Sequence, residues 1–102
     1  MMKYAAEFLG TFFFLSVILH ATSKSAVWPA MTPLLIAVGL LAAITTAAGT
    51  SGAHLNPAVS VMMAMKGALP QGDVLGYVGA QILGGVTALW VYRMVQGKSV
   101  AK

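Results

Sequence analysis

One polar segment, Ser51-Gly52-Ala53-His54-Leu55-Asn56-Pro57-Ala58-Val59, joins two stretches that are each apolar enough to enter a lipid bilayer. Backbone that is not helical is tolerated at membrane depth only where protein or a water-filled path satisfies its N–H and C=O groups. An Asn-Pro turn that opens a short helix at such a depth therefore indicates a loop that lines a pore. The segment occurs only once in the chain.

The composition is that of a membrane protein. Hydrophobic residues make up 59% of the 102 residues and charged residues only 8%, whereas about a quarter of the residues of a soluble domain are charged. The basic residues lie singly near the ends of segments, where they indicate interfacial anchors and topology signals and not a nucleic-acid site. They are Lys3, Lys24, Lys66, Arg93, Lys98 and Lys102.

The functions that need clustered reactive groups are disfavoured. The chain has no cysteine and only two acidic residues, so it offers no disulfide framework, no thiol nucleophile and no pair of acid and base groups. We therefore expect no metal site, no cofactor and no enzyme activity.

The apolar stretches predict an all-α membrane protein, a single domain over residues 1–102, with three transmembrane helices over about residues 4–20, 32–48 and 74–95. Glu7 lies inside the first stretch, which argues for a span over a cleaved signal peptide. Asp73 is expected to cap the third span, and the polar tail 96–102 is expected to fray.

A fourth helical segment is too short to cross the membrane. Residues 56–66 predict a helix with Asn56 as its N-cap and Pro57 in its first turn, which are positions that these residues favour. About ten residues reach only halfway through the hydrocarbon core, so we expect a re-entrant half-helix. Asn56, Pro57 and Ala58 would then place an amide donor and the positive end of a helix dipole at mid-membrane, where cations are repelled.

Small residues recur every fourth position in the last span and share one face of it, namely Gly76, Ala80, Gly84 and Ala88. Small residues at this spacing let two helices approach closely in lipid. The stripe predicts a helix–helix contact.

These motifs resemble those of the aquaporin family, also called the major intrinsic proteins. The resemblance rests on Ala6-Glu7-Phe8-Leu9-Gly10-Thr11, on Ser51 to Val59 and on Tyr77 to Gly85, and it matches the first of the two inverted halves of that family. It implies half of an aquaporin-like inverted-repeat fold. Members of the family conduct water, glycerol or similar neutral solutes through a pore formed where two half-helices meet at their N-termini, and four pores usually assemble as a tetramer.

The resemblance also implies roles for three polar residues. Glu7, His54 and Gln81 would brace the re-entrant loop. Each has a simpler explanation: Glu7 could sit at headgroup level, His54 could be an isolated loop histidine, and Gln81 could hydrogen-bond a neighbouring helix. A carboxylate inside a span is costly unless it is paired, which favours the brace for Glu7.

The selectivity filter differs from the usual one. Where the second half of the family carries an arginine after Asn-Pro-Ala, this chain has Val59. Filter positions carried over from the family give Ile36, with Val38 as the alternative, from one copy and Ile44, Ala53 and Val59 from the other. Such a mouth has no fixed charge, so size and dewetting would select the solute.

One half-helix cannot close a pore, which leaves three hypotheses. Two copies inserted in opposite orientations could form an antiparallel homodimer, or a higher oligomer, that passes water and glycerol-like solutes. The basic residues divide two against four between the two sides, a bias weak enough to permit dual insertion. The chain could instead be a non-conducting subunit that pairs with a complementary half, or a truncated fragment of a longer channel.

Overall fold

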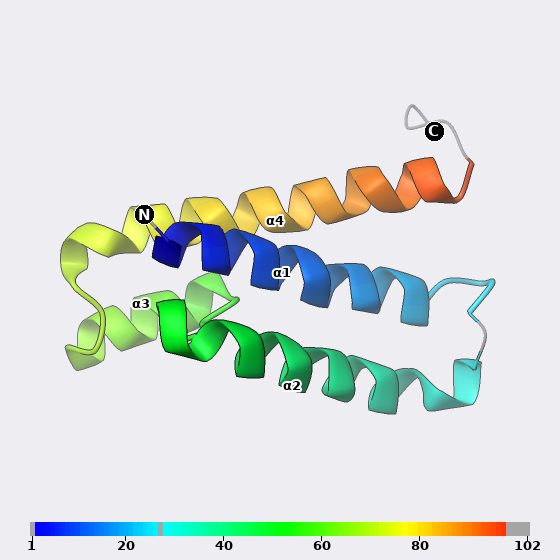
Figure 1. Cartoon of the computed structure of the whole chain (residues 1–102), viewed down its shortest axis with the longest axis horizontal. Coiled ribbons are helices and arrows are strands. Elements are labelled where there is room, and N and C mark those ends of the chain that lie inside the picture. Colours follow the sequence, from blue (N-terminus) through cyan, green and yellow to red (C-terminus); the bar gives the residue numbers. More distant parts are fainter. Residues whose placement is uncertain (1, 27, 98–102) are drawn as a thin grey trace.

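A computed structural model describes residues 2–26 and 28–97 of the chain, and every regular element in that part is helical (Figure 1). Three long helices run side by side, with α1 lying between α2 and α4, and a shorter helix covers one end of the bundle. The elements in chain order are α1 (Met2–Ala21), η1 (Pro29–Met31), α2 (Thr32–Ser51), α3 (Pro57–Lys66), η2 (Gln71–Asp73) and α4 (Val74–Val95).

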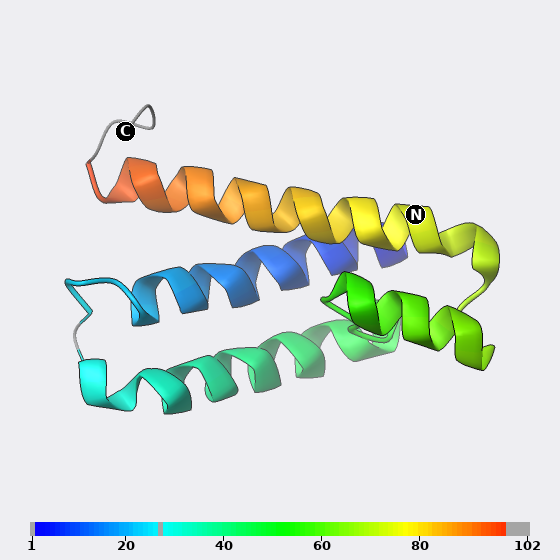
Figure 2. The same ribbon diagram turned by 180° about the vertical axis from the view of Figure 1, so that it is seen from behind.

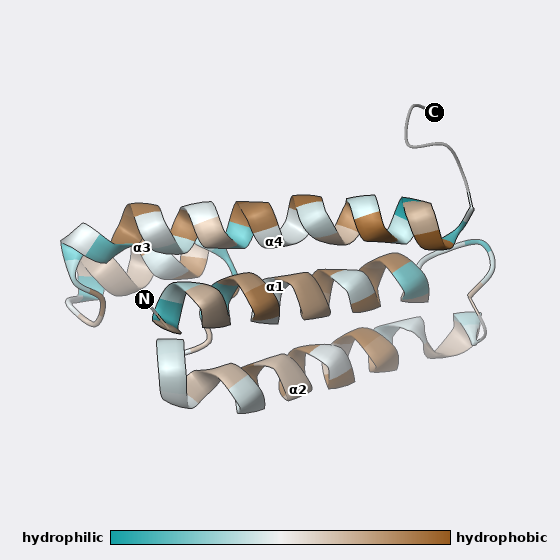
Figure 3. Cartoon of the chain, turned by 45° about the horizontal axis from the view of Figure 1, so that its top comes forward, coloured by the Kyte–Doolittle hydropathy of each residue, from teal (hydrophilic) through white to brown (hydrophobic). Residues whose placement is uncertain are grey.

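The three long helices meet the requirements of membrane spans. Each lies in a segment of at least 20 residues with few charges, over Met2–Ala21, Pro29–Ser51 and Gln71–Val95. A 20-residue helix is about 30 Å long, which matches the hydrocarbon core of a bilayer. Apolar residues lie along the helices and hydrophilic ones mostly near their ends (Figure 3). The predicted all-α membrane fold, with three spans and one half-helix, is confirmed.

The structure differs from the sequence-based predictions at the end of α2 and at the start of α4. α2 continues through Gly49 to Ser51, three residues beyond its expected end, and stops where Gly52 adopts a left-handed conformation with φ of 85°, as glycine readily does at a helix C-terminus.

The predicted cap at Asp73 is wrong, because its side chain makes no capping hydrogen bond. Its carboxylate instead accepts hydrogen bonds from Lys3 Nζ at 2.8 Å and Tyr4 OH at 3.1 Å. Most of the predicted frayed tail, with Lys98 and Lys102, lies outside the described residues.

The small-residue stripe of α4 faces α1 in the same chain. A Cβ atom at Gly84 would lie 2.7 Å from the carbonyl oxygen of Phe8, so the two backbones approach more closely than a larger residue permits. The ring of Tyr4 occupies the space beside Gly76. Ala88 is buried, and Ala80 is half-buried.

The half-helix α3 begins near the middle of the bundle and returns toward the end where α2 stops and α4 starts (Figure 2). Asn56 has an extended backbone and its Oδ1 accepts the N–H of Ala58 at 2.8 Å, which is the geometry of an N-cap. Pro57 follows at the first helical position, where its missing N–H costs nothing. Gly67, with φ of 91°, ends the helix.

Candidate functional site

The loop between α2 and α3 has an energetically unfavourable backbone conformation. Gly52, Ala53 and Leu55 have φ values of 85°, 52° and 57°, a left-handed region that costs residues with a Cβ atom free energy. Ala53 and Leu55 are also buried. Such a loop persists only where contacts from the rest of the protein hold it.

Glu7 supplies two of those contacts and accepts two further hydrogen bonds from α2 and α4. Its carboxylate is fully buried. Oε2 accepts hydrogen bonds from Ser51 Oγ at 2.6 Å and from the His54 N–H at 3.0 Å. Oε1 accepts them from the Leu55 N–H at 2.8 Å and from Gln81 Nε2 at 2.7 Å. Four donors converge on this carboxyl group, which acts only as an acceptor. One side chain of α1 therefore connects the end of α2, the loop and α4.

Ser60 forms a second junction, on the first turns of α3. Its buried hydroxyl lies 2.9 Å from His54 Nδ1 and accepts a hydrogen bond from Gln81 Nε2 at 2.9 Å. Gln81 therefore bridges Glu7 and Ser60, and α3 is fixed against α4. The structure thus brings together Glu7, His54 and Gln81, the three residues singled out as braces.

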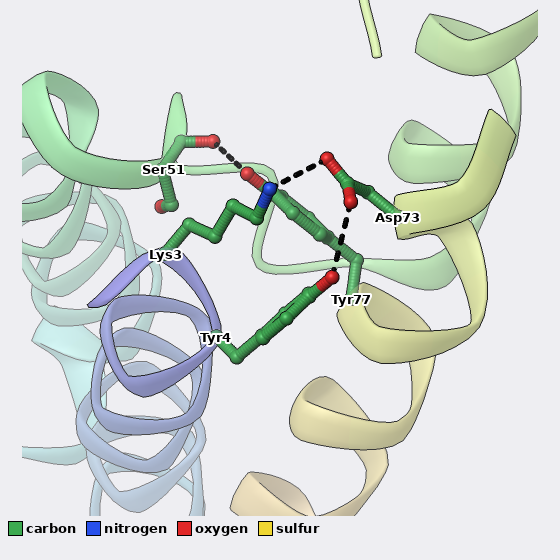
Figure 4. A network of polar contacts seen from close by, with 5 residues as sticks. All are labelled: Lys3, Tyr4, Ser51, Asp73 and Tyr77. Carbon is green, nitrogen blue, oxygen red and sulfur yellow. Dashed lines mark hydrogen bonds and ion pairs between the residues drawn. The ribbon is translucent and has the colours of Figure 1, made fainter. Parts of the chain in front are cut away.

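A tyrosine completes the support (Figure 4). Tyr77 OH donates to the carbonyl oxygen of Ser51 at 2.8 Å, which satisfies a carbonyl that the end of α2 leaves without a helical partner. The ring of Tyr77 also meets that of Tyr4 edge-on, with centroids 5.9 Å apart. Tyr4 in turn donates to Asp73, which is paired with Lys3 (Figure 4).

The backbone N–H and C=O groups of the loop differ in whether they have hydrogen-bond partners within the protein. The N–H groups of residues 52–55 all donate to the protein, to the Ala48 carbonyl, Ser51 Oγ and the Glu7 carboxylate. The carbonyl oxygens of residues 52–55 accept no hydrogen bond from any described residue. Asn56 is exposed, and because its Oδ1 is engaged by Ala58, its Nδ2 keeps two donors for another molecule. The loop therefore carries backbone acceptors without a described partner, and the next residue, Asn56, carries side-chain donors without one.

The four filter candidates are spread over α2, the loop and α3. Ile36 is half-buried and Ile44 is 39% exposed. They are eight positions apart, which corresponds to about 12 Å along α2. Ala53 is buried and Val59 is half-buried. Their assignment to a constriction stays a prediction.

Sequence reasoning missed Ser60, Tyr77 and the free carbonyl groups. A signal existed for Ser60 and Tyr77, since a hydroxyl inside an apolar segment is costly unless it is paired, and Tyr77 precedes Gln81 by one helical turn. The free carbonyl groups belong to the backbone, so the residue types in the sequence do not indicate them. Among the residues that the structure describes, no three potential metal ligands lie together.

A half-helix that begins near the middle of a bundle of membrane spans, with an Asn-Pro-Ala sequence at its start, and ends at one end of the bundle defines one half of an aquaporin-like fold. The class is that of an integral, multi-pass membrane protein. The family model described as major intrinsic protein matches residues 1–102. The chain belongs to the major intrinsic protein family.

Relatives of the chain carry the names of water and glycerol channels. It is 39% identical over 94 residues to aquaporin Z of Bradyrhizobium diazoefficiens, which covers 86% of this chain and 39% of that protein. It is 40% identical over 96 residues to glycerol uptake facilitator protein-like 6 of Lactiplantibacillus plantarum, with 86% and 41% covered. Aquaglyceroporin-2 of Trypanosoma brucei brucei is 40% identical over 85 residues, with 79% and 27% covered. The chain thus spans less than half the length of these relatives.

Proposed function

We propose that two inverted copies of this chain pair to form a passive channel for water and glycerol-like neutral solutes. The observation that carries the proposal is the arrangement at the start of α3. The start of α3 lies near the middle of the bundle (Figure 2). The Asn56 amide that caps it is exposed, and the four residues before it have backbone carbonyl groups with no partner among the described residues. Unpaired backbone at this depth calls for a water-filled path.

The flank of α3 supports the pairing. α3 packs against α4, while Val61 is 46% exposed, Met62 54% and Met65 82%. An open apolar groove of about 600 Å³ runs beside these residues, between α3 and α4. A second half would cover this flank.

A second groove lies beside the start of α3. It has a volume of about 470 Å³ and is bounded by α1 and α4, with Phe14, Ile82 and Val86 on its walls and Asn56 and Pro57 beside them. The half-helix of an inverted copy, entering from the opposite side, would bring its own Asn56 to this place. The two positive helix ends would then face each other at mid-membrane.

Such a pore would discriminate by hydrogen bonding at the centre and by size at the mouth. The carbonyl groups of residues 52–55 and Asn56 Nδ2 would replace the hydrogen bonds that a water or polyol molecule loses on entry. Each helix N-terminus carries about +0.5 charge, so cations would be repelled. The mouth candidates are all apolar, and a wide range of small neutral solutes would pass them. They are Ile36, Ile44, Ala53 and Val59.

The uncovered flank of α3 also fits a second function. A complementary half, encoded separately, would cover Val61, Met62 and Met65 as well as an inverted copy would. The chain would then be a subunit that conducts nothing by itself.

Stopped-flow light scattering on proteoliposomes tests the proposal. Vesicles holding the purified protein should shrink faster than empty vesicles under an osmotic gradient and should take up glycerol. Asn56→Asp keeps the N-cap acceptor but replaces the donor with a negative charge, so it should reduce water flux and admit cations. The matched control is Lys66→Gln, at the far end of α3, which should leave the flux unchanged. If vesicles holding folded and inserted protein shrink no faster than bare lipid, the hypothesis of a homomeric channel is wrong. That result would favour the hypothesis of a subunit that conducts nothing by itself.

A further inference from the structure

An apolar groove lies where α1 ends and α2 begins. This end of the bundle is opposite to the end that α3 covers (Figure 1). Its volume is about 430 Å³, and its lining includes Phe13, Ser16, His20, Ala26 and Trp28. No part of the re-entrant loop belongs to it. We propose that this groove binds one anionic phospholipid, with the phosphate at the rim and an acyl chain between the helices.

The lining of the groove changes from polar at the rim to apolar deeper in, which matches the order of headgroup, ester and acyl chain in a phospholipid. His20 lies in the last turn of α1, Ser16 one turn deeper by about 6 Å, and Phe13 deeper by about 10 Å. The hydroxyl of Ser16 makes no hydrogen bond to any described residue, although its carbonyl oxygen accepts one from His20 Nδ1 at 2.9 Å. That hydroxyl is free to donate to the ester carbonyl of a lipid, which lies just below the phosphate. Below it the walls are apolar.

One basic residue, Lys24, lies close in the chain to residues that line the groove. Lys24 is exposed in the loop after α1, and Ala21 and Ala26, on either side of it in the chain, both line the groove. Lys24 has no ion-pair or hydrogen-bond partner among the residues that the structure describes. Basic residues beside a groove between membrane helices favour anionic headgroups.

The acidic residues of the chain lie elsewhere. The sequence contains only two. Glu7 is buried beneath the loop before α3, and Asp73 is paired with Lys3 at the other end of the bundle. A second copy of this chain therefore offers no free carboxylate to match Lys24, whereas a phosphate does.

The groove is long enough for a hydrocarbon chain. A second groove of about 320 Å³ continues along α1 and α2 toward the other end, and Phe13 lines both. At the rim, Trp28 is 62% exposed, as is typical of a tryptophan at the membrane interface. Trp28 also provides a reporter at the site.

The test is the quenching of Trp28 fluorescence in vesicles by lipids brominated on their acyl chains. The other tryptophan, Trp90, is changed to Phe so that only Trp28 emits. Brominated phosphatidylglycerol should quench Trp28 at lower mole fractions than brominated phosphatidylcholine with the same chains. Lys24→Gln should weaken this preference about fivefold, the value of one lysine near an anionic surface. The matched control Lys66→Gln, at the opposite end, should keep the preference.

Other outcomes overturn the proposal. Equal quenching by the two lipids would mean ordinary annular lipid at this position. An equal effect of Lys24→Gln and Lys66→Gln would mean that only the overall charge matters. Protection of Trp28 from both lipids would mean that another protein surface, such as a second copy, covers the groove. Ser16→Ala gives an independent check, since it should weaken quenching by phosphatidylglycerol without changing the charge of the rim.

Discussion

Oε1 of Glu7 accepts the backbone N–H of Leu55 at 2.8 Å, although the two residues lie 48 positions apart in the sequence. Leu55 is one of two residues other than glycine with a positive φ in the described part of the chain. The carboxylate of α1 therefore holds the loop in a conformation that the loop would not keep by itself. The position of Asn56, the next residue, depends on this contact.

Glu7→Gln should destabilise the protein by about 2–4 kcal/mol, because the new amide turns a donor toward two of the four donors that the carboxylate accepts. Unfolding followed in detergent by circular dichroism measures the loss. The control is Asp73→Asn, which alters the other acidic residue at a half-exposed ion pair and should have the smaller effect. Equal effects would contradict the bracing role of Glu7.

Tyr77→Phe should cost about 1–2 kcal/mol, since it leaves the carbonyl oxygen of Ser51 buried without its donor. Tyr92→Phe removes a hydroxyl from the same helix, where only a ring contact with His20 is found among the described residues, and it should be nearly neutral. Thermal unfolding of the two variants in one detergent compares them. The account fails if Tyr92→Phe proves the more harmful of the two.

Gly84→Ala should destabilise the packing of α1 against α4 by about 1–3 kcal/mol, because the added methyl group would meet the backbone of Phe8. Gly79→Ala on the same helix is the matched control, because a Cβ atom there has nothing within 4 Å. It should be neutral or stabilise the protein by up to about 1 kcal/mol, because alanine is the better helix former. Similar losses for both variants would contradict the close contact, because helix propensity alone favours alanine over glycine.

Much of this architecture could be predicted from the sequence. Three apolar stretches indicate three spans, and the Asn-Pro pair indicates the start of α3, because hydropathy and capping are local properties. The stripe of Gly76 and Gly84 likewise indicates a close contact before its partner is known.

Other features depend on tertiary contacts and could not be predicted in this way. Asp73 stands before α4 like a cap, but Lys3 and Tyr4 compete for its carboxylate, and these residues are about 70 positions away in the sequence. The roles of Ser60 and Tyr77 follow only once α3 lies against α4. The left-handed residues Ala53 and Leu55 give no sign in the sequence, because only the contacts of Glu7 and Ser51 hold them there.

Cysteine cross-linking tests the central claim of inverted pairing most directly. The chain contains no cysteine, so Ala58→Cys introduces a single thiol at the exposed start of α3. In an inverted pair, the two α3 N-termini meet at mid-membrane, close enough for the Cα separation of less than about 7 Å that a disulfide needs. The control is Met65→Cys, on the same exposed flank but about 10 Å further along α3. In an inverted pair, the two copies of residue 65 diverge toward opposite membrane faces.

Inverted pairing predicts an oxidised dimer from Ala58→Cys in vesicles and none from Met65→Cys. A dimer from Met65→Cys without one from Ala58→Cys would mean that the copies associate in the same orientation, which would contradict the account.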